Sequence, residues 1–368
     1  MKVQRIDSNN FKGYDVRPLK GFLMNSNPYG IANEMKAIAD REGFKLYSVV
    51  ERGVSNKCVR PTEKSLLDAW AQDIWTILKD NILNKKNDKK TEYIKDFFGL
   101  KNNFVQHKLR DSISENKHIS GGNLFIVNGV KGDEVLVGQG SLKDFSVSTI
   151  KEMYNVEKVT ILPQMDFHLD LFIRPLDKQR ILLADDKLVL KALKKGYDKF
   201  LYFMSTLSNS EREQYLLQGV AFQNLIRECE VSQNSNCNAK SDEVESILKR
   251  RGFEVIKVPG RIYDTSGYCG AGFLYHTCNY MNANVIKNPE GKLVYITNKS
   301  FIDDRLRLTP ELSKKIGFSF ENEFVKSISE YVDREHIYFI NGEKDFVKNQ
   351  MLYSYGGGIH CLCTEIPE

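Results

Sequence analysis

Apolar and polar positions along the chain repeat one pattern, in which a helical stretch is followed by a short β-rich run. In the first copy, Ile31, Met35 and Ile38 fall on one face of a helix that Gly43 ends, since a helix C-cap favours a residue that tolerates positive φ. Residues 44–50 then form the β-rich run. Three further copies pair residues 146–154 with 158–162, 241–251 with 253–258, and 321–332 with 336–340. The pattern predicts an α/β protein.

Each copy leads into a polar segment that secondary structure alone does not require. The segments are Trp70–Asp73, Phe167–Asp170, Asn279–Asn282 and Gly356–Cys361. Strand hairpins also recur, with residues 123–128 facing 134–137, 170–175 facing 180–184, and 293–297 as the second arm of another. Units spaced by roughly a hundred residues are too long for a solenoid repeat. They fit one domain of pseudo-equivalent modules around a centre where the polar segments converge, and ordinary α/β alternation fits the periodicity equally well.

Two stretches depart from this repeat. Residues 187–231 have a helical pattern and precede a polar break at 234–239, which predicts an inserted helical pair or lid, or a purely structural cover. Residues 84–90, with the sequence NKKNDKK, predict a solvated loop. Because no aromatic residues interleave with these lysines, nucleic acid is not an expected partner.

Composition adds few constraints beyond ordinary globular character. The 368 residues are 41% hydrophobic and 27% charged, with a formal net charge of +5, which supplies ample apolar mass for a core. The first residues lack an apolar signal region, and no apolar stretch is long enough for a bilayer, so no membrane partner is expected. The 7 cysteines are spaced for neither a zinc cluster nor a disulfide framework. These features predict a reduced, cytoplasmic-type compartment, with signal-less export left open.

Cys361 is the first candidate for chemistry. It follows three glycines and His360, and consecutive glycines suit a backbone that bends sharply or passes close to a ligand. A cysteine after such a turn could be presented into a pocket, although a buried structural cysteine is the common alternative. Cys363 is the second candidate nucleophile. As a strand neighbour of the nucleophile, His360 is expected to point to the opposite face and to be structural.

Two acidic segments complete the candidate chemistry. If residues 166–170 form a strand, Asp166, His168 and Asp170 share one face, where two acids would orient the histidine ring and raise its pKa. A metal could use the same residues, but no second histidine stands at helical ligand spacing, and no metal is predicted. Residues 68–73, with the sequence DAWAQD, suit recognition of a flat cation, or form an ordinary solvated helix end.

Taken together, these segments resemble the guanidino-group-modifying enzymes, the catalytic branch of the pentein fold. The ending Gly-Gly-Gly-Ile-His-Cys resembles the end of agmatine deiminases. The DAWAQD segment is similar to their first acidic motif, but Gln72 replaces the usual arginine, and Trp-x-Gln-Asp is also the form seen in protein-arginine deiminases. Residues 168–184 resemble the His-x-Asp segment and hairpin of the latter, and Gly121-Gly122-Asn123 matches a segment of both groups. The resemblance runs from about Leu66 to the C-terminus.

The resemblance implies a fold and a set of roles. The fold would be a pentein-type pseudo-fivefold α/β propeller, a single catalytic domain over residues 1–368 with a divergent part at 1–64 and a helical insertion at about 187–239. Cys361 would be the nucleophile and His168 the acid/base, while Asp73 and Asp170 would hold the guanidinium. Further substrate contacts would come from Trp70, Gly122, Asn123 and Gly358.

The activity implied is hydrolytic deimination of arginine, agmatine or protein arginine through a covalent thiouronium, with release of ammonia. Two alternatives stay open, an amidinotransferase that uses the same site with an amine acceptor and a non-catalytic pentein, like a ribosome anti-association factor of this fold. No cofactor is expected. Calcium, which animal protein-arginine deiminases need, is not expected either, because Ile74 and Trp75 rather than an acid follow Asp73. The oligomeric state is left open.

Overall fold

The protein is built from five small sheets that share one topology. The computed structural model describes residues 19–25, 30–50, 53–55, 71, 75–78, 81–84, 89–102, 119, 121–129, 132–165, 168–233, 237–260, 279–300, 302–340 and 358–367. In each sheet, a central strand pairs antiparallel with one neighbour and parallel with the other. Along the chain, the two parallel strands are connected by a segment that contains at least one helix. The α/β class predicted from the sequence is confirmed.

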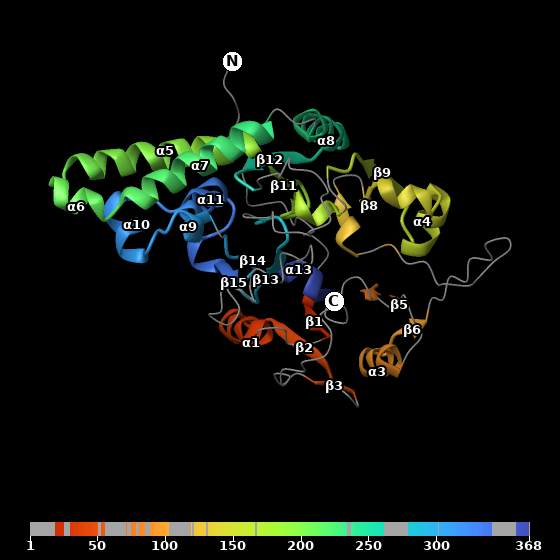
Figure 1. Ribbon diagram of the computed structural model, residues 1–368. Helices are drawn as coiled ribbons and strands as arrows, with labels where there is room; N and C mark the ends of the chain where they lie inside the picture. The colour runs from red at the N-terminus through yellow and green to blue at the C-terminus, as the bar shows by residue number, and fades with distance from the viewer. Residues whose placement is uncertain are drawn as a thin grey trace, which may run out of the picture.

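The modules follow one another in chain order around a centre where α13 (Ile359–Leu362) lies (Figure 1). The first module combines both ends of the described chain, with β16 (Cys363–Pro367), β1 (Leu19–Met24), α1 (Ile31–Glu42), β2 (Lys45–Val50) and the added β3 (Gly53–Ser55). The second holds β4 (Trp75–Ile77), β5 (Asn81–Asn84), α3 (Lys89–Phe98) and β6 (Lys101–Asn102). The third holds β7 (Leu124–Gly129), β8 (Gly132–Gly138), α4 (Val147–Tyr154) and β9 (Lys158–Leu162).

The last two modules carry more helix. The fourth holds β10 (Ile173–Pro175), β11 (Arg180–Ala184), α5 (Asp186–Ser205), α6 (Asn209–Glu213), α7 (Leu216–Gln233), α8 (Cys237–Arg251) and β12 (Glu254–Val258). The fifth holds β13 (Asn284–Lys287), β14 (Leu293–Asn298), α9 (Ile302–Arg305), α10 (Pro310–Ile316), α11 (Phe320–Ile328) and β15 (Ile337–Ile340). Short 3₁₀ turns η4 (Gly121–Asn123), η5 (Gln139–Lys143), η6 (Leu169–Leu171) and η7 (Arg334–His336) connect elements.

Local sequence explains the helix–strand units that the hydrophobic pattern predicts. Helix α1 ends at Gly43, whose φ of 78° is the left-handed conformation that glycine adopts without a Cβ penalty. Helix α4 begins after Ser146, whose side chain accepts a hydrogen bond from the Thr149 backbone N–H. All four predicted units are present, as α1 with β2, α4 with β9, α8 with β12, and α11 with β15. The three predicted hairpins are present as β7–β8, β10–β11 and β13–β14.

The second module was not predicted, and its helix corrects the reading of residues 84–90 as a loop. Lys89 and Lys90 begin α3, while residues 85–88 lie outside the described part of the chain. The helix forms because its inner face buries Ile94 and Thr91, and Trp75 of β4 donates its indole N–H to the Thr91 hydroxyl over 3.0 Å. The two lysines at the helix start are compatible with this packing because Lys89 is exposed and Lys90 Nζ donates to Asn25 Oδ1 over 3.2 Å.

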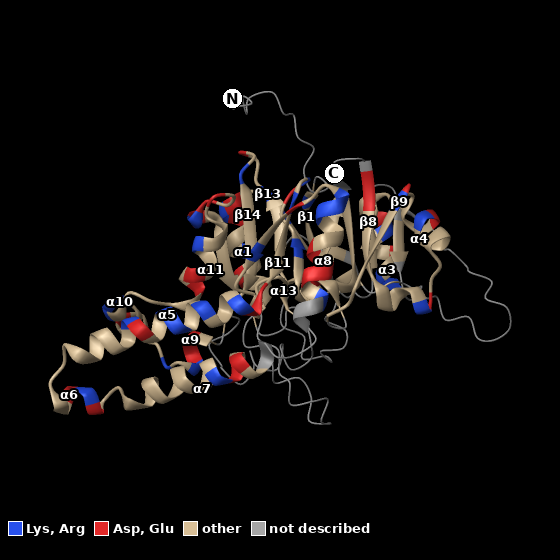
Figure 2. Ribbon diagram, turned by 90° about the horizontal axis from the view of Figure 1, so that it is seen from above, with Lys and Arg blue, Asp and Glu red and all other residues tan. Residues whose placement is uncertain are grey.

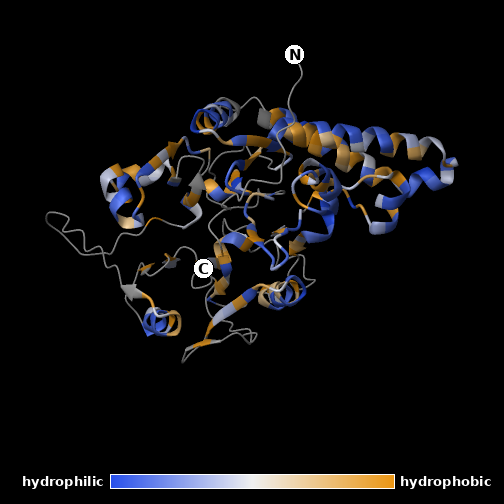
Figure 3. Cartoon of the chain, turned by 180° about the vertical axis from the view of Figure 1, so that it is seen from behind, coloured by the Kyte–Doolittle hydropathy of each residue, from blue (hydrophilic) through white to orange (hydrophobic). Residues whose placement is uncertain are grey.

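Helices α5, α6 and α7 form an arm that extends away from the sheets (Figure 2), and the helical pattern predicted over residues 187–231 is confirmed. Hydrophobic positions recur along α5 and α7 (Figure 3), and the rings of Phe200 and Phe222 lie 5.6 Å apart between them. At Gly196 a Cβ would lie 2.6 Å from the Phe318 ring, so this glycine permits close packing against the fifth module. Among the described residues, no helix is both long and apolar enough to cross a membrane.

The first and last strands of the described chain pair in one sheet, and this places the C-terminal segment that carries Cys361 at the centre. Strand β1 pairs antiparallel with β16, with Met24 opposite Cys363 and Leu23 opposite Thr364. Helix α13 directly precedes β16, so residues 359–362 are held where the modules meet. Burial of Ile359 and Leu362 in the core of the first and fifth modules anchors the turn.

Candidate active site

Three asparagine side chains hold the turn that carries Cys361. The Ile359 N–H donates to Asn298 Oδ1 over 2.9 Å, and the His360 N–H donates to Asn282 Oδ1 over 2.8 Å. Asn284 Nδ2 donates to the Ile359 carbonyl over 3.2 Å. These bonds satisfy backbone groups at the start of α13 that a four-residue helix cannot satisfy internally. The third polar segment and β13–β14 therefore position the C-terminal segment.

Gly358 has a packing reason to be glycine. A Cβ at this position would lie 2.6 Å from both Asn282 Oδ1 and Asn298 Nδ2, the same side chains that hold α13. No real Cβ contact is this short, so a side chain would displace the asparagines. The substrate contact predicted for Gly358 stays a prediction.

The thiol of Cys361 lies in a buried polar cluster around one carboxylate oxygen. Cys361 Sγ is 3.3 Å from Asp170 Oδ2 and 3.1 Å from Asn282 Nδ2, and Asn282 Nδ2 also donates to Asp170 Oδ2 over 2.8 Å. The side chains of Asp170 and Asn282 are inaccessible to solvent, and Cys361 is 2% exposed. Asp170 Oδ2 is thus the shared acceptor of the cluster.

His168, the residue that precedes η6, is the third ionisable side chain of this cluster. One ligand atom each of His168, Asp170 and Cys361 lies within 4.8 Å of the others, although Cys361 is 191 residues from Asp170 along the chain. His168 is partly exposed, whereas Asp170 and Cys361 are buried. The most accessible of the three is therefore His168, the residue that the sequence predicts to exchange protons with the substrate and water.

The local structure around His168 differs from the predicted strand. Leu169–Leu171 form a 3₁₀ turn closed by the Phe172 N–H donating to the Leu169 carbonyl over 3.0 Å. All three turn residues are buried, so the inward and outward alternation of a strand does not apply. His168, which precedes the turn, and Asp170 within it nevertheless approach the same point, each with one ligand atom within 4.8 Å of the other. Asp166 lies outside the described residues.

Gly122 leaves room for His168. A Cβ on Gly122 would lie 2.5 Å from His168 Nδ1 and 3.0 Å from Asp170 Oδ2, so η4 presses backbone against the cluster. Asn123, the next residue, has its side chain committed elsewhere. Its Nδ2 donates to Ser141 Oγ over 2.8 Å, and its Oδ1 accepts from Gln164 Nε2 over 3.0 Å. The substrate contacts predicted for these two residues stay predictions.

The contact at Gly122 gives a test of where His168 must lie. Changing Gly122 to alanine should push the imidazole away from Asp170 and Cys361 and lower kcat by about 100-fold, the lower end of what a general acid–base residue contributes. The thermal midpoint should change little if His168 moves toward solvent. Steady-state kinetics on a guanidinium substrate measures the effect, with Gly219→Ala as the control. The added Cβ there lies 3.4 Å from the Phe200 ring, within the helical arm. Wild-type kcat in Gly122→Ala would show that the observed contact does not position a catalytic group.

His360 is a site residue that the sequence reading missed. It was expected to point away as a strand neighbour, but it lies in a helical turn, is fully buried and has Nδ1 2.8 Å from Asp170 Oδ2. Burial, together with the nearby Arg174 and His168, holds the pKa of His360 well below its usual value. The neutral ring therefore carries its proton on Nδ1 and donates it to the Asp170 carboxylate. The Phe125 ring stacks on the His360 ring, and the two ring centroids lie 5.5 Å apart.

Asn282 is the second residue whose role was missed. Asn279–Asn282 is one of the four polar segments that the sequence places near the centre, and this pattern is the sequence signal that could have identified Asn282. Its role depends on contacts with Asp170 and Cys361, which lie 112 and 79 residues away along the chain. Asp73 and Trp70, the remaining predicted site residues, lie outside the described residues.

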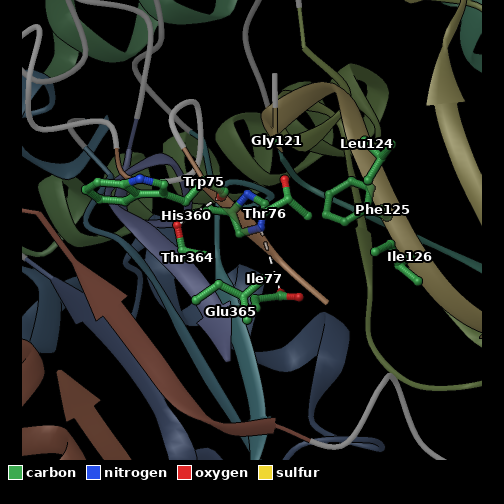
Figure 4. Close-up of a pocket in the computed structure, with 10 residues that line it drawn as sticks. All are labelled: Trp75, Thr76, Ile77, Gly121, Leu124, Phe125, Ile126, His360, Thr364 and Glu365. Carbon is green, nitrogen blue, oxygen red and sulfur yellow. Dashed lines mark hydrogen bonds and ion pairs between the residues drawn. The ribbon is translucent and has the colours of Figure 1, made fainter. Parts of the chain in front are cut away.

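A small pocket of about 40 Å³ lies on the opposite edge of His360 (Figure 4). It is bounded by Trp75, Phe125, His360 and Glu365 among others, and Cys361 and His168 do not line it. Glu365 Oε1 lies 3.9 Å from His360 Nε2 and 2.9 Å from Arg174 Nη2. A volume of this size suits water rather than a guanidine with its carbon chain.

Cys363, the alternative nucleophile, lies in a different environment. It is fully buried in the apolar core beside Met24 and Leu362. Burial raises the pKa of its thiol to about 12, although a hydrogen bond with Asn284 acts in the opposite direction. A thiol of that pKa is almost entirely protonated at pH 7 and is a poor nucleophile. The surroundings of the two thiols therefore favour Cys361 over Cys363 as the nucleophile.

Comparisons with known proteins assign no family. No family model and no curated protein matches the chain. Among solved structures, an agmatine deiminase of C. jejuni is similar, with 14% sequence identity over 96% of this chain and 94% of that chain, and a TM-score of 0.44.

Proposed function

We propose that this protein hydrolyses a guanidinium group through a covalent intermediate on Cys361. The observation that carries the proposal is the meeting of Cys361 Sγ, Asp170 Oδ2 and Asn282 Nδ2 within 3.3 Å contacts, with His168 beside them. These are the residues for which the motif resemblance implies nucleophile, guanidinium holder and acid/base. The fivefold repeat of one sheet topology supports a pentein-type arrangement as the scaffold.

The buried carboxylate explains why the substrate would be a cation. Asp170 is inaccessible to solvent, and burying a carboxylate is costly unless charge-assisted hydrogen bonds compensate it. A guanidinium is planar and carries several N–H donors, which suits one or two carboxylates. Asp170 would hold one edge of the guanidinium, and the sequence motif assigns the other edge to Asp73.

The chemistry then follows in two stages. The Cys361 thiol gives its proton to His168, and the resulting thiolate attacks the guanidinium carbon and forms a tetrahedral adduct. His168 donates a proton to the departing nitrogen, which leaves as ammonia and generates a thiouronium on Cys361. His168 then takes a proton from water as it attacks the same carbon. Collapse of the second adduct breaks the C–S bond, restores the thiol and releases a ureido product.

Substrate binding would itself activate the thiol. With the Asp170 carboxylate 3.3 Å from Cys361 Sγ, a thiolate in the empty site would face a like charge in a buried setting, which disfavours ionisation. A bound guanidinium places a positive charge beside both groups and reverses the balance. This arrangement keeps the thiol protonated until a cation of the correct shape arrives.

One set of assays tests the activity. We expect a ureido product and ammonia from at least one of arginine, agmatine and an arginine-containing peptide, incubated in parallel without an added amine. An amidinotransferase would release no ammonia under these conditions and would need an amine acceptor. A binding protein would yield neither product with any of the three substrates, and that result would contradict the proposal.

A further inference from the structure

A second polar cluster lies at the seam between the first and fifth modules, at the start of β15. Its centre is His336, which is 8% exposed and ends the 3₁₀ turn η7. His336 Nδ1 lies 3.0 and 2.9 Å from the two carboxylate oxygens of Glu42, the last residue of α1. Glu42 also accepts hydrogen bonds from the Tyr338 hydroxyl and, over 3.1 Å, from Asn288 Nδ2. The carboxylate is thus held from three directions.

These bonds fix the tautomer of the His336 ring. Burial raises the pKa of Glu42, but the hydrogen bonds from Tyr338, His336 and Asn288 outweigh it and hold the pKa below its usual value. The Glu42 carboxylate accepts a hydrogen bond from His336 Nδ1. In the neutral imidazole, this arrangement leaves the lone pair on Nε2.

His336 Nε2 has no hydrogen-bond partner among the described residues, although it is buried. The nearest charged group is Glu335, with Oε1 3.5 Å from Nε2. Asp333 joins them because side chains three residues apart eclipse one another in a 3₁₀ turn, and one donor atom from each residue lies within 4.8 Å of the others. The buried Nε2 therefore lies beside the Glu335 carboxylate, and Asp333 completes a group of three ligand side chains.

We propose that Asp333, Glu335 and His336 bind a divalent transition-metal ion of the zinc class. Imidazole nitrogen with carboxylate oxygens suits such ions, and metal-bound histidine commonly donates its other N–H to a carboxylate, as His336 does to Glu42. Ligand atoms of a tetrahedral zinc site lie about 3.4 Å apart, which the observed Nε2–Oε1 separation of 3.5 Å matches. The side chains of Asp333 and Glu335 are 64% and 63% exposed, so they can reorient around an ion.

The sequence prediction of no metal site differs from this proposal for an identifiable reason. That prediction rests on the spacing of the cysteines and on the absence of a second histidine at helical ligand spacing, whereas this cluster has one histidine. Its outer carboxylate, Glu42, lies 294 residues away. The proposal is independent of the chemistry proposed for Cys361.

Lys292 is the intramolecular competitor for the ion. Its Nζ lies 3.5 Å from Glu335 Oε1 and 3.9 Å from Asp333 Oδ2, and its side chain is 42% exposed. An exposed lysine can move away at little cost, because exposed ion pairs contribute at most about 1 kcal/mol. Metal binding would then tie η7 more firmly to the seam with α1 and stabilise the folded chain, since an ion that binds only that state shifts the unfolding equilibrium.

Zinc titration calorimetry and thermal unfolding of the full chain test the site. All proteins carry Cys361→Ala, because His168, Asp170 and Cys361 also offer metal ligands. We expect one Zn²⁺ per chain and a higher thermal midpoint. Asp333→Asn with Glu335→Gln should weaken binding at least about 100-fold, since loss of outer-shell partners alone costs about 10- to 100-fold. Glu311→Gln with Glu330→Gln, an exposed pair with the same charge change, should bind as the parent does.

Lys292→Gln separates a metal site from an ordinary ion pair. If the ammonium competes with the ion, this variant should bind Zn²⁺ more tightly than the parent, whereas an ion pair with no metal role predicts no gain. The proposal is overturned if the parent binds no Zn²⁺ or if the Asp333→Asn, Glu335→Gln variant binds it equally well. It is also overturned if Lys292→Gln gains no affinity. Circular dichroism checks that each variant is folded.

Discussion

Cys361→Ala is expected to abolish turnover and leave the fold and most guanidinium binding in place. The loss in kcat should be at least about 10⁴-fold, the scale found when a member of a covalent catalytic set is removed. The fold should persist because a buried thiol is replaced by a smaller apolar group. Binding should persist because Asp170, with Asp73, supplies the charge that recognises the cation, and neither residue is changed.

Mass spectrometry of the quenched reaction measures the predicted intermediate directly. Wild-type protein mixed with substrate should carry an adduct on the peptide that contains Cys361, and the alanine variant should carry none. Cys363→Ala is the matched control, because that thiol is buried in the core and should be dispensable for turnover. An adduct on Cys363, or full activity in Cys361→Ala, would exclude Cys361 as the nucleophile. Hydrolase and transferase mechanisms share this intermediate, so ammonia release has to distinguish them.

Asp170→Asn should have the second-largest effect. It should weaken guanidinium binding and make the Cys361 thiol more reactive. A buried guanidinium would lose charge-assisted hydrogen bonds worth about 1.5–3 kcal/mol each, which corresponds to about a 10- to 150-fold weaker interaction per bond. Asparagine still offers an oxygen to Asn282 and His360, so the variant should fold. Binding of a non-reactive guanidine, measured by calorimetry, tests the loss.

The thiol should meanwhile become more reactive in the absence of substrate. Removing the carboxylate 3.3 Å from Cys361 Sγ removes the like charge that opposes thiolate formation. Alkylation by iodoacetamide at pH 7 should therefore be faster in Asp170→Asn than in wild type. Asp303→Asn, which changes another buried carboxylate that caps α11, should alkylate at the wild-type rate. Slower alkylation in Asp170→Asn would refute substrate-assisted activation of Cys361.

Local sequence accounts for the elements whose periodicity is strong. The amphipathic face and C-terminal glycine of α1 predict a helix that the structure has, and the β-rich runs of β7, β8, β10 and β11 predict hairpins that it also has. The second module was missed because its strands β4, β5 and β6 span only 3, 4 and 2 residues, too few for a pattern to emerge. Its helix begins inside a lysine-rich run that resembles a loop.

The motifs identified Cys361, His168 and Asp170 as candidates, since residue type and order along the chain are enough to suggest a reaction. How these side chains meet was decided by the tertiary structure. The turn that presents Cys361 is too short to be stable alone and depends on Asn282 and Asn298 from another module. That helical turn, rather than a strand, directs His360 onto Asp170. Such contacts join residues more than sixty positions apart, and no local propensity encodes them, because they form only when all the modules close around the centre.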